Sequence, residues 1–398
     1  MADDEVSYEP VSVKEVLAEM KDTAELLIDL SYSAVLLGSD EVAEEVLALE
    51  EKMDVLQLRA RMSILMAARS PSDAEALAPV LGIVGAAEKI SDAAGDIAKV
   101  VLEDVGLPEE MRAALPEAME TLVRAEVGAD SSLVGATLGG VHLETETGVR
   151  VLAIRRTGGW LLNPDASTEL RAGDVTLLRG PEDGIAEVYA DATGDEYEPP
   201  DPPTEEGTDL DRAVDSIVLM KDMGELGVDL AYGAILFDSE EVAEEVFELE
   251  AEVDALQSRF EAWTLRAAER TDDPVTLRGL VQLASGTEVI SDAALEISEG
   301  VLRGLSTHPV VREAVYESDE VIDRLVVEPD SALDGTTLGD REVKTETGMR
   351  VIGVRHTEKD RRSWDISPGP DTQLDAGDVL LAKGTRTGAE RLAELVTR

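Results

Sequence analysis

The sequence contains no cysteine and only three histidines among its 398 residues. The absence of cysteine excludes disulfides, zinc sites with thiolate ligands, iron–sulfur clusters and thiol nucleophiles. With only three histidines, the sequence offers few candidates for the general base of a catalytic triad. No Gly-x-Gly-x-x-Gly motif follows a predicted strand, so the sequence gives no support to a nucleotide-binding Rossmann domain. We therefore expect a protein that is not an enzyme.

Basic residues are scarce, since 35 lysines and arginines stand against 86 aspartates and glutamates, a formal net charge of −51. Nucleic acids are bound through basic patches, so no nucleic-acid partner is expected. Self-repulsion of this charge is screened at molar salt, where the Debye length is about 3 Å. The composition is typical of a protein from a halophilic archaeon.

Long apolar runs are also absent. No stretch of about 18 apolar residues could span a bilayer. Residues 1–12 are acidic and do not show the basic region and apolar core of a signal peptide. We expect a cytoplasmic protein that does not insert into the membrane.

The sequence does contain an internal duplication. The segment Ser39-Asp-Glu-Val-Ala-Glu-Glu-Val recurs as Ser239-Glu-Glu-Val-Ala-Glu-Glu-Val, and Ile90-Ser-Asp-Ala-Ala recurs as Ile290-Ser-Asp-Ala-Ala. The two halves therefore follow one plan, displaced by 200 residues.

The first part of each half has the period of amphipathic helices. In the first half, apolar residues recur at spacings of four and three, which places them on one helical face: Val42, Val46, Leu49, Met53 and Leu56. Break signals at residues 38–40, 70–73 and 106–108 predict three long helices and a shorter fourth helix from about residue 109 to residue 126. Short connections favour an antiparallel bundle.

The second part of each half is rich in short strands. Residues 149–154 and 175–178 are β-branched, apolar runs bounded by turn signals. Gly148 and Gly173 mark chain reversals, and both recur in the second half. Each half therefore ends in a small β-rich module.

These patterns predict an α+β fold of two repeats, each an antiparallel bundle of three or four helices followed by a small α/β module. The predicted bundles span residues 8–127 and 209–327, the modules span residues 128–193 and 328–398, and an acidic, proline-rich linker spans residues 194–208. Such a linker allows the halves to dock within one chain as a pseudo-dimer, and a homodimer is the alternative arrangement.

Pairs of acidic residues four positions apart are the candidate metal ligands of this sequence. The pairs are Glu50 with Asp54, Glu88 with Asp92, Glu250 with Asp254, and Glu288 with Asp292. Each pair projects from one face of its helix, where like charges repel by a few tenths of a kcal/mol. A divalent cation would relieve that repulsion, because carboxylate oxygens suit magnesium, calcium, manganese or iron. The alternative is a solvated helix face, since more than a fifth of the residues are acidic.

Three motifs of the modules resemble the TrkA C-terminal domain, also called the RCK C-terminal domain. They are Leu133-Val-Gly-Ala-Thr-Leu, Gly148-Val-Arg-Val before an apolar strand, and Leu170-Arg-Ala-Gly-Asp. The second half repeats them as Leu333-Asp-Gly-Thr-Thr-Leu, Gly348-Met-Arg-Val and Leu374-Asp-Ala-Gly-Asp. The resemblance covers about sixty residues in each half.

The helical parts resemble PhoU-like proteins, whose three-helix bundles bind metal clusters through paired Glu-x-x-x-Asp motifs. Glu88 and Asp92 match the signature Glu-Arg-Ile-x-Asp in Ala87-Glu-Lys-Ile-Ser-Asp, and Glu288 with Asp292 matches it without the basic second residue. The glycine that usually precedes the aspartate is Ser91 here. The resemblance implies a metal role for the carboxylate pairs.

Together the resemblances imply a regulatory subunit of a cation transport system, most plausibly for potassium. It would sense a small ligand or ion and act by contact with a membrane transporter or channel subunit. A phosphate-signalling adaptor, a metal-binding protein and a regulator of magnesium transport are the alternatives.

Arginines at the ends of matching strands are candidate ligand-binding residues. Some relatives of the TrkA C-terminal domain bind a cyclic dinucleotide where modules pair, and Arg155, Arg156 and Arg355 are the cations suited to such an anion. Pairing of these arginines with the abundant carboxylates is the alternative.

Overall fold

A computed structural model describes most of the chain. The described residues are 12–107, 121–141, 143, 147–156, 159–162, 164, 166–180, 182–197, 208–271, 273–303, 308–317, 321–356, 364–366 and 368–397. The chain divides into two compact units, and each contains segments from both halves of the sequence. A helical unit comes from residues 1–114 and 204–319, and a unit of two β-rich modules comes from residues 115–203 and 320–398.

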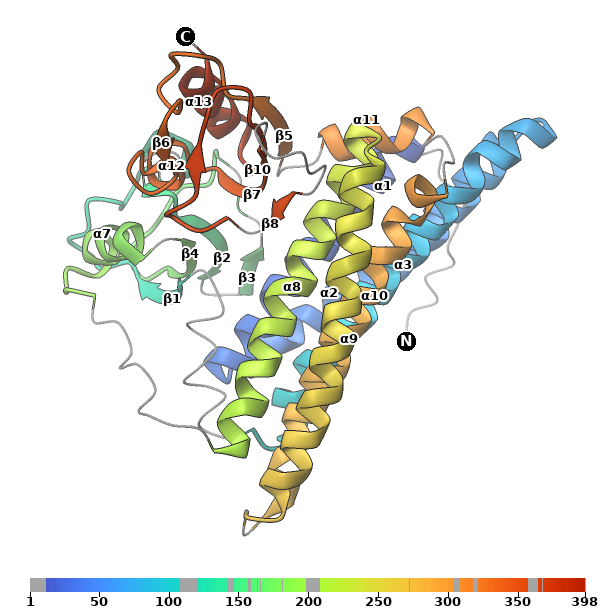
Figure 1. Cartoon of the computed structure of the whole chain (residues 1–398). Helices are drawn as coiled ribbons and strands as arrows, with labels where there is room; N and C mark the ends of the chain where they lie inside the picture. The colour runs from blue at the N-terminus through green and yellow to red at the C-terminus, as the bar shows by residue number, and fades with distance from the viewer. Residues whose placement is uncertain are drawn as a thin grey trace. The chain divides into compact units, whose positions relative to one another are not determined.

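The helical unit repeats a set of three long helices (Figure 1). The first set is α1 (Val13–Leu37), α2 (Asp40–Ala67) and α3 (Pro71–Leu102). The second set is α8 (Asp209–Phe237), α9 (Glu240–Ala268) and α10 (Arg278–Leu302), with a 3-10 turn η1 (Pro274–Leu277) before α10 and a short helix α11 (Pro309–Glu317) after it. These elements confirm the predicted helical bundles.

Local sequence signals start and stop these helices. The Ser39 hydroxyl accepts a hydrogen bond from the Val42 amide at 3.3 Å, and Ser239 does the same for Val242 at 3.3 Å. Gly38 ends α1 with a φ of 55°, a left-handed conformation that favours glycine. The predicted apolar stripe of α2 is buried except for Leu49, which is partly buried. Burial of these stripes supplies most of the helices' stability.

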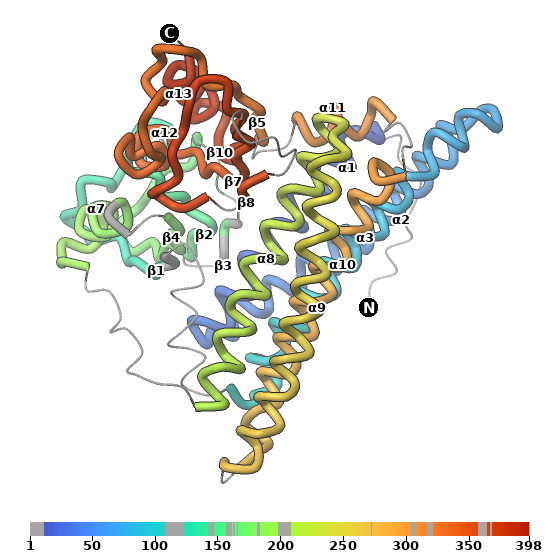
Figure 2. The backbone as a smooth tube through the Cα atoms, in the orientation of Figure 1, coloured from blue at the N-terminus to red at the C-terminus, as the bar shows by residue number. Residues whose placement is uncertain are grey.

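The two helical bundles pack against each other through α3 and α10, which lie side by side in Figures 1 and 2. Gly286 of α10 lies in close contact with Ile97 of α3. The Gly279 amide donates a hydrogen bond of 3.0 Å to the Gly106 carbonyl. Buried Tyr32 of the first half and Thr287 of the second half share a hydrogen bond of 2.6 Å between their hydroxyls. The predicted docking of two halves within one chain is confirmed for the helical parts.

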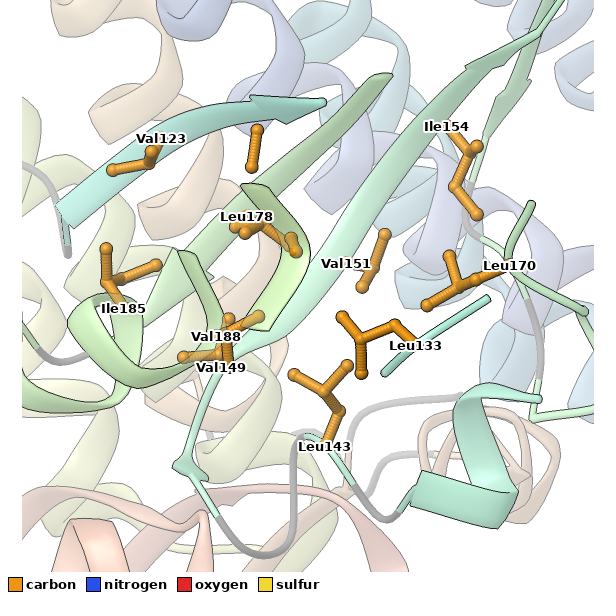
Figure 3. Packing of buried hydrophobic residues seen from close by; sticks show 12 residues of the cluster. Val123, Leu133, Leu143, Val149, Val151, Ile154, Leu170, Leu178, Ile185 and Val188 are labelled. Atoms are coloured by element: carbon orange, nitrogen blue, oxygen red, sulfur yellow. The ribbon is translucent and has the colours of Figure 1, made fainter. Parts of the chain in front are cut away.

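The first module is an antiparallel sheet with one covering helix. Its elements are β1 (Thr121–Glu126), α5 (Leu138–Val141), β2 (Arg150–Arg156), β3 (Gly159–Leu162), β4 (Val175–Gly180) and α7 (Glu182–Thr193). The strand order is β1-β4-β2-β3, with all neighbours antiparallel. Figure 3 shows the core, in which Ile185 and Val188 of α7 pack against apolar residues of the sheet such as Leu178.

The second module repeats this topology. Its elements are β5 (Val321–Val326), β6 (Thr336–Thr337), α12 (Val343–Thr347), β7 (Arg350–Arg355), β8 (Asp365–Ile366), β9 (Gln373–Leu374), β10 (Val379–Gly384) and α13 (Arg386–Val396). The main sheet has the order β5-β10-β7-β8, and β6 pairs with β9. Both modules skip one residue in the pairing register, at Leu152 and at the equivalent Ile352. A shared bulge indicates one backbone plan for both copies.

Two predicted boundaries are wrong. Residues 121–126 do not end a fourth helix but form β1, which pairs with β4, and residues 321–326 form β5, which pairs with β10. The helical bundles therefore end before residues 127 and 327, and the modules begin earlier than predicted. The short runs fit either a helix or a strand by their local pattern, and pairing with a distant strand decides between the two.

None of the helices in the described residues has the length and apolar content that a bilayer span requires.

The close approach of α10 to the chain after α3 gives a testable prediction. A Cβ atom at Gly279 would overlap the Gly106 carbonyl oxygen, so Gly279→Ala should lower the free energy of unfolding by about 1–3 kcal/mol. Gly82 in α3 has open space around it, so Gly82→Ala should raise the free energy of unfolding by about 1 kcal/mol through helix propensity. Chemical denaturation of both variants checks this, and a loss of stability in Gly82→Ala would contradict it.

Candidate carboxylate clusters in the helical unit

The structure brings the predicted acidic pairs of the first half together. Glu50 and Asp54 lie on α2, Glu88 and Asp92 lie on α3, and a three-residue connection makes the two helices antiparallel neighbours. One carboxylate oxygen from each of Asp54, Glu88 and Asp92 lies within 4.8 Å of the others. We call Glu50, Asp54, Glu88 and Asp92 the first carboxylate cluster. Their spacing suits a cation bound by oxygen ligands.

Burial and mutual repulsion change the acidity of this cluster. Burial is the largest cause that raises the pKa of Glu50, and the charges of Asp92, Asp96 and Asp54 raise it further. Burial also raises the pKa of Asp92, with added repulsion from Glu88, Asp54 and Asp96. Each of these carboxylates holds its negative charge less readily than it would in water. A bound cation would offset this electrostatic cost.

Lys99 of α3 supplies a cation beside the cluster. Its ammonium lies 2.9 Å from Asp96 Oδ1 and 4.0 Å from Glu50 Oε1, and its charge opposes the rise in the pKa of Glu50 that burial causes. Gly95 lies directly under the Glu50 carboxylate, because a Cβ atom at Gly95 would overlap that carboxylate. The sequence reasoning did not predict a role for either residue. The scarcity of lysine in the chain was a signal that could have drawn attention to Lys99.

The second half forms an equivalent cluster on α9 and α10. Glu250 and Asp254 lie on α9, Glu288 and Asp292 lie on α10, and we call these four residues the second carboxylate cluster. Burial, followed by the charges of neighbouring carboxylates, raises the pKa values of Glu250, Glu288 and Asp292. In the described residues, three carboxylates within 4.8 Å of one another occur in the first cluster and not in the second.

A lysine from the first half reaches the second cluster. Lys89 of α3 donates a hydrogen bond to Glu296 of α10, and its charge opposes the rise in the pKa of Asp292 that burial causes. All the predicted acidic residues are thus brought together in two clusters, and each cluster has one lysine of α3 beside it. A role of these residues in metal binding stays a prediction. Their all-oxygen donor set fits magnesium, calcium or manganese.

The predicted arginines of the modules have different surroundings. Arg156 binds both carboxylate oxygens of buried Asp174 at 2.8 Å and also donates to the Glu169 carbonyl. Asp174 in turn accepts a hydrogen bond from the Arg171 amide at 2.9 Å, which closes the turn before β4. Arg156 therefore stabilises its own module. This agrees with the alternative that the sequence left open, in which the arginine pairs with a carboxylate.

Arg155 is the penultimate residue of β2, and Arg355 is the last residue of the equivalent strand β7. The Arg355 guanidinium lies 5.4 Å from the centroid of the Trp364 ring, and Arg155 pairs with Trp160 in the register of β2 and β3. The Arg355 guanidinium therefore contacts a tryptophan ring, and binding of an anion at Arg155 or Arg355 stays a prediction.

The counterpart of Arg156 in the second module is His356, which the sequence reasoning did not single out for this position. Its Nδ1 lies 2.9 Å from Asp378 Oδ2, and Asp378 is buried like Asp174. The repeat of the Ala-Gly-Asp turn was the sequence signal that could have predicted the equivalent pair of His356 and Asp378.

Family comparisons agree with the repeats in the structure. The family model described as the TrkA-C domain matches residues 122–192 and 324–397. The model described as the PhoU domain matches residues 17–101 and 217–301.

Individual similar proteins match parts of the chain. "Probable potassium channel protein 2" of Methanocaldococcus jannaschii is 28% identical over 137 residues, which cover 32% of this chain and 38% of that protein. "Uncharacterized protein YrvC" of Bacillus subtilis is 28% identical over 106 residues, which cover 25% of this chain and 61% of that protein. The matches span less than two thirds of either relative. The crystal structure of PhoU from Pseudomonas aeruginosa is 12% identical, with a TM-score of 0.41 over 73% of this chain and 96% of that one.

The raised pKa of Glu50 in the first carboxylate cluster predicts a pH dependence of stability. Because burial raises the pKa of Glu50, the folded chain binds this proton more tightly than the unfolded chain does. Charged Glu50 therefore lowers stability at neutral pH, and the fold gains stability as the pH falls toward the pKa of Glu50. Glu50→Gln should raise the free energy of unfolding at about pH 7 and flatten its dependence between about pH 7 and pH 5.

The matched control is Glu44→Gln, an exposed residue of the same helix. Both variants are unfolded by heat in about 2 M potassium chloride, which screens the general repulsion of an acidic chain. Equal effects of the two substitutions at every pH would contradict a special environment for Glu50.

Proposed function

Since the chain belongs to the proteins that combine two PhoU domains with two TrkA-C domains, we propose that it is a non-catalytic, cytoplasmic regulator of cation transport. In this role it acts by contact with a membrane transporter or channel subunit, most plausibly for potassium. A relative whose name is that of a probable potassium channel protein supports the transport role. The carboxylate clusters bind a ligand in this role and do not transform it.

The sensing step that the geometry supports best is binding of a divalent cation by the first carboxylate cluster. Three carboxylate oxygens from α2 and α3 within 4.8 Å of one another carry this proposal. Such a cation would replace mutual repulsion by attraction and would compete with the Lys99 ammonium near Glu50. Magnesium, calcium and manganese are the matching ions, because all the donors are hard oxygen atoms.

A small anionic ligand at the modules is a second sensing step. Arg155 and Arg355 remain the candidate residues for a cyclic dinucleotide, because they occupy matching positions of β2 and β7 and Arg355 also lies beside the Trp364 ring. Arg156 is a weaker candidate, since Asp174 and the Glu169 carbonyl already bind its guanidinium.

The PhoU domains also support a phosphate-signalling adaptor, and a site for magnesium would suit a regulator of magnesium transport. Transport measurements distinguish these alternatives from regulation of potassium transport, because each predicts a different affected solute.

Metal binding is tested by thermal unfolding of the full chain with manganese, magnesium or calcium in molar potassium chloride. A cation at a hundred times its dissociation constant should add about 2.7 kcal/mol to the free energy of unfolding. Glu88→Gln combined with Asp92→Asn should lose most of this gain, because it removes two ligand charges. The control combines Glu44→Gln with Glu51→Gln, two exposed residues of α2. An unchanged metal response in the first variant would contradict the assignment.

The transport role is tested by uptake of rubidium, as a tracer for potassium, in cells with and without the gene. We expect deletion to change rubidium influx and the intact gene to restore it. Phosphate and magnesium accumulation are measured in the same cells. A change in phosphate alone would favour the adaptor, and a change in magnesium alone would favour the magnesium regulator.

A further inference from the structure

The last turns of α2 carry an apolar stripe on the side of the helix that faces away from the core. Leu58, Leu65 and Met66 are 44%, 69% and 60% exposed, and Val55 and Met62 are half-buried. These turns lead to the connection with α3, in light blue at the upper right of Figure 1. We call these five residues the α2 stripe: Val55, Leu58, Met62, Leu65 and Met66.

The α2 stripe lies opposite the face that α2 buries in the helical unit. Leu56, Ala60 and Ile64 are buried, and the stripe residues Leu58 and Met62 follow the first two of them at an offset of two positions. At 3.6 residues per turn, two positions rotate the side chain by about 200° around the helix. The stripe is therefore a second apolar face and not the margin of the core.

The spacing along this face is that of a coiled-coil seam. Val55, Leu58, Met62 and Leu65 recur at intervals of three, four and three residues, which is the pattern that two paired helices use for their contact.

The duplication shows that the bundle does not require this face to be apolar. The equivalent positions of α9 hold small, polar or charged residues except at one leucine: Ala255, Ser258, Ala262, Leu265 and Arg266. An exposed apolar patch that the fold does not need is typical of an interaction site. The α2 stripe therefore serves a contact that the second half lacks.

The stripe also lies in a stretch of chain without acidic residues. Between Asp54 and Asp73 there is no aspartate or glutamate, although these types make up more than a fifth of the sequence, and the stretch contains Arg59, Arg61 and Arg69. Two copies of a chain with a net charge of −51 repel each other over most of their surfaces. Close approach of two copies costs less free energy along an acid-free helix.

We propose that the α2 stripe is the contact between two copies of this chain, whose α2 helices pack antiparallel about a twofold axis. A twofold axis makes every contact reciprocal, so each pairing of unlike positions occurs twice. When Leu58 of one copy faces Met62 of the other, Val55 faces Leu65 in the same register. The four seam residues of each helix thus form four apolar layers.

Charge complementarity selects a second copy as the occupant. The same register brings exposed Glu51 of one copy to exposed Arg69 of the other, where Arg69 follows the end of α2 by two residues. Opposite charges therefore flank the apolar layers at both ends. A parallel pair would instead place Glu51 beside Glu51 and Arg69 beside Arg69, which repel.

The dimer is tested by sedimentation equilibrium of the full chain over roughly a hundredfold range of concentration. The buffer contains about 2 M potassium chloride, which screens the repulsion between two acidic copies, and a chelator, because no divalent cation takes part in the contact. We expect twice the mass of one chain. Leu65→Glu should weaken association about tenfold or more, because it buries a charge among apolar side chains.

The matched control is Leu265→Glu, which makes the same change at the equivalent position of α9, where the leucine is 71% exposed. It should associate as the unmodified chain does. Circular dichroism checks that the variants are folded, and Met66→Glu replaces Leu65→Glu if the latter does not fold.

The antiparallel arrangement is tested by disulfide formation, for which the absence of cysteine makes introduced thiols specific. Chains with Leu58→Cys are mixed with chains with Met62→Cys and oxidised. The mixed dimer should exceed both dimers of like chains, because the two unlike positions face each other within disulfide distance. Chains with Ser258→Cys and chains with Ala262→Cys, the equivalent positions of α9, should give no such excess.

Three results would overturn the proposal: a monomer at every concentration, equal association of Leu65→Glu and Leu265→Glu, and an excess of disulfides between like chains. A monomer that binds lipid vesicles or a polyglutamate peptide, with binding lost in Leu65→Glu, would also overturn it. That result would assign the α2 stripe to a bilayer or to an acidic protein segment.

Discussion

The packing of α3 against α10 is the contact on which the rest of the helical unit depends. Apolar residues of α3 such as Ile90 and Ile97 are fully buried, and burial of such a side chain contributes about 1.5–3 kcal/mol. Repulsion between like charges four residues apart costs only a few tenths of a kcal/mol per pair. Apolar packing of α3 therefore outweighs the repulsion, and the packing of α2 against α3 holds Glu88 and Asp92 close to the acidic residues of α2.

The duplication has produced two clusters that differ in their surroundings. Gly95, which makes room for Glu50, is replaced by Leu295 in the second half, and Lys99 is replaced by Glu299. The second cluster instead has Lys89 beside it, from the other bundle. Charge compensation is thus internal to the first bundle and crosses between the bundles at the second cluster.

The sequence predicts the long helices and the acidic faces well, because both depend on residues three or four positions apart. It fails where a distant partner decides the structure. Residues 121–126 form β1 only because β4 pairs with them. The role of Arg156 depends on Asp174, which lies 18 residues away, and local patterns cannot assign that pairing. The grouping of Asp54 with Glu88 and Asp92 likewise required the packing of two helices.

The most direct test of a cation site between α2 and α3 is anomalous diffraction from crystals of the full chain grown with manganese. We expect a peak within bonding distance of carboxylate oxygens of Asp54, Glu88 and Asp92, because these oxygens already lie close together. Manganese peaks elsewhere with none at these three residues would contradict it.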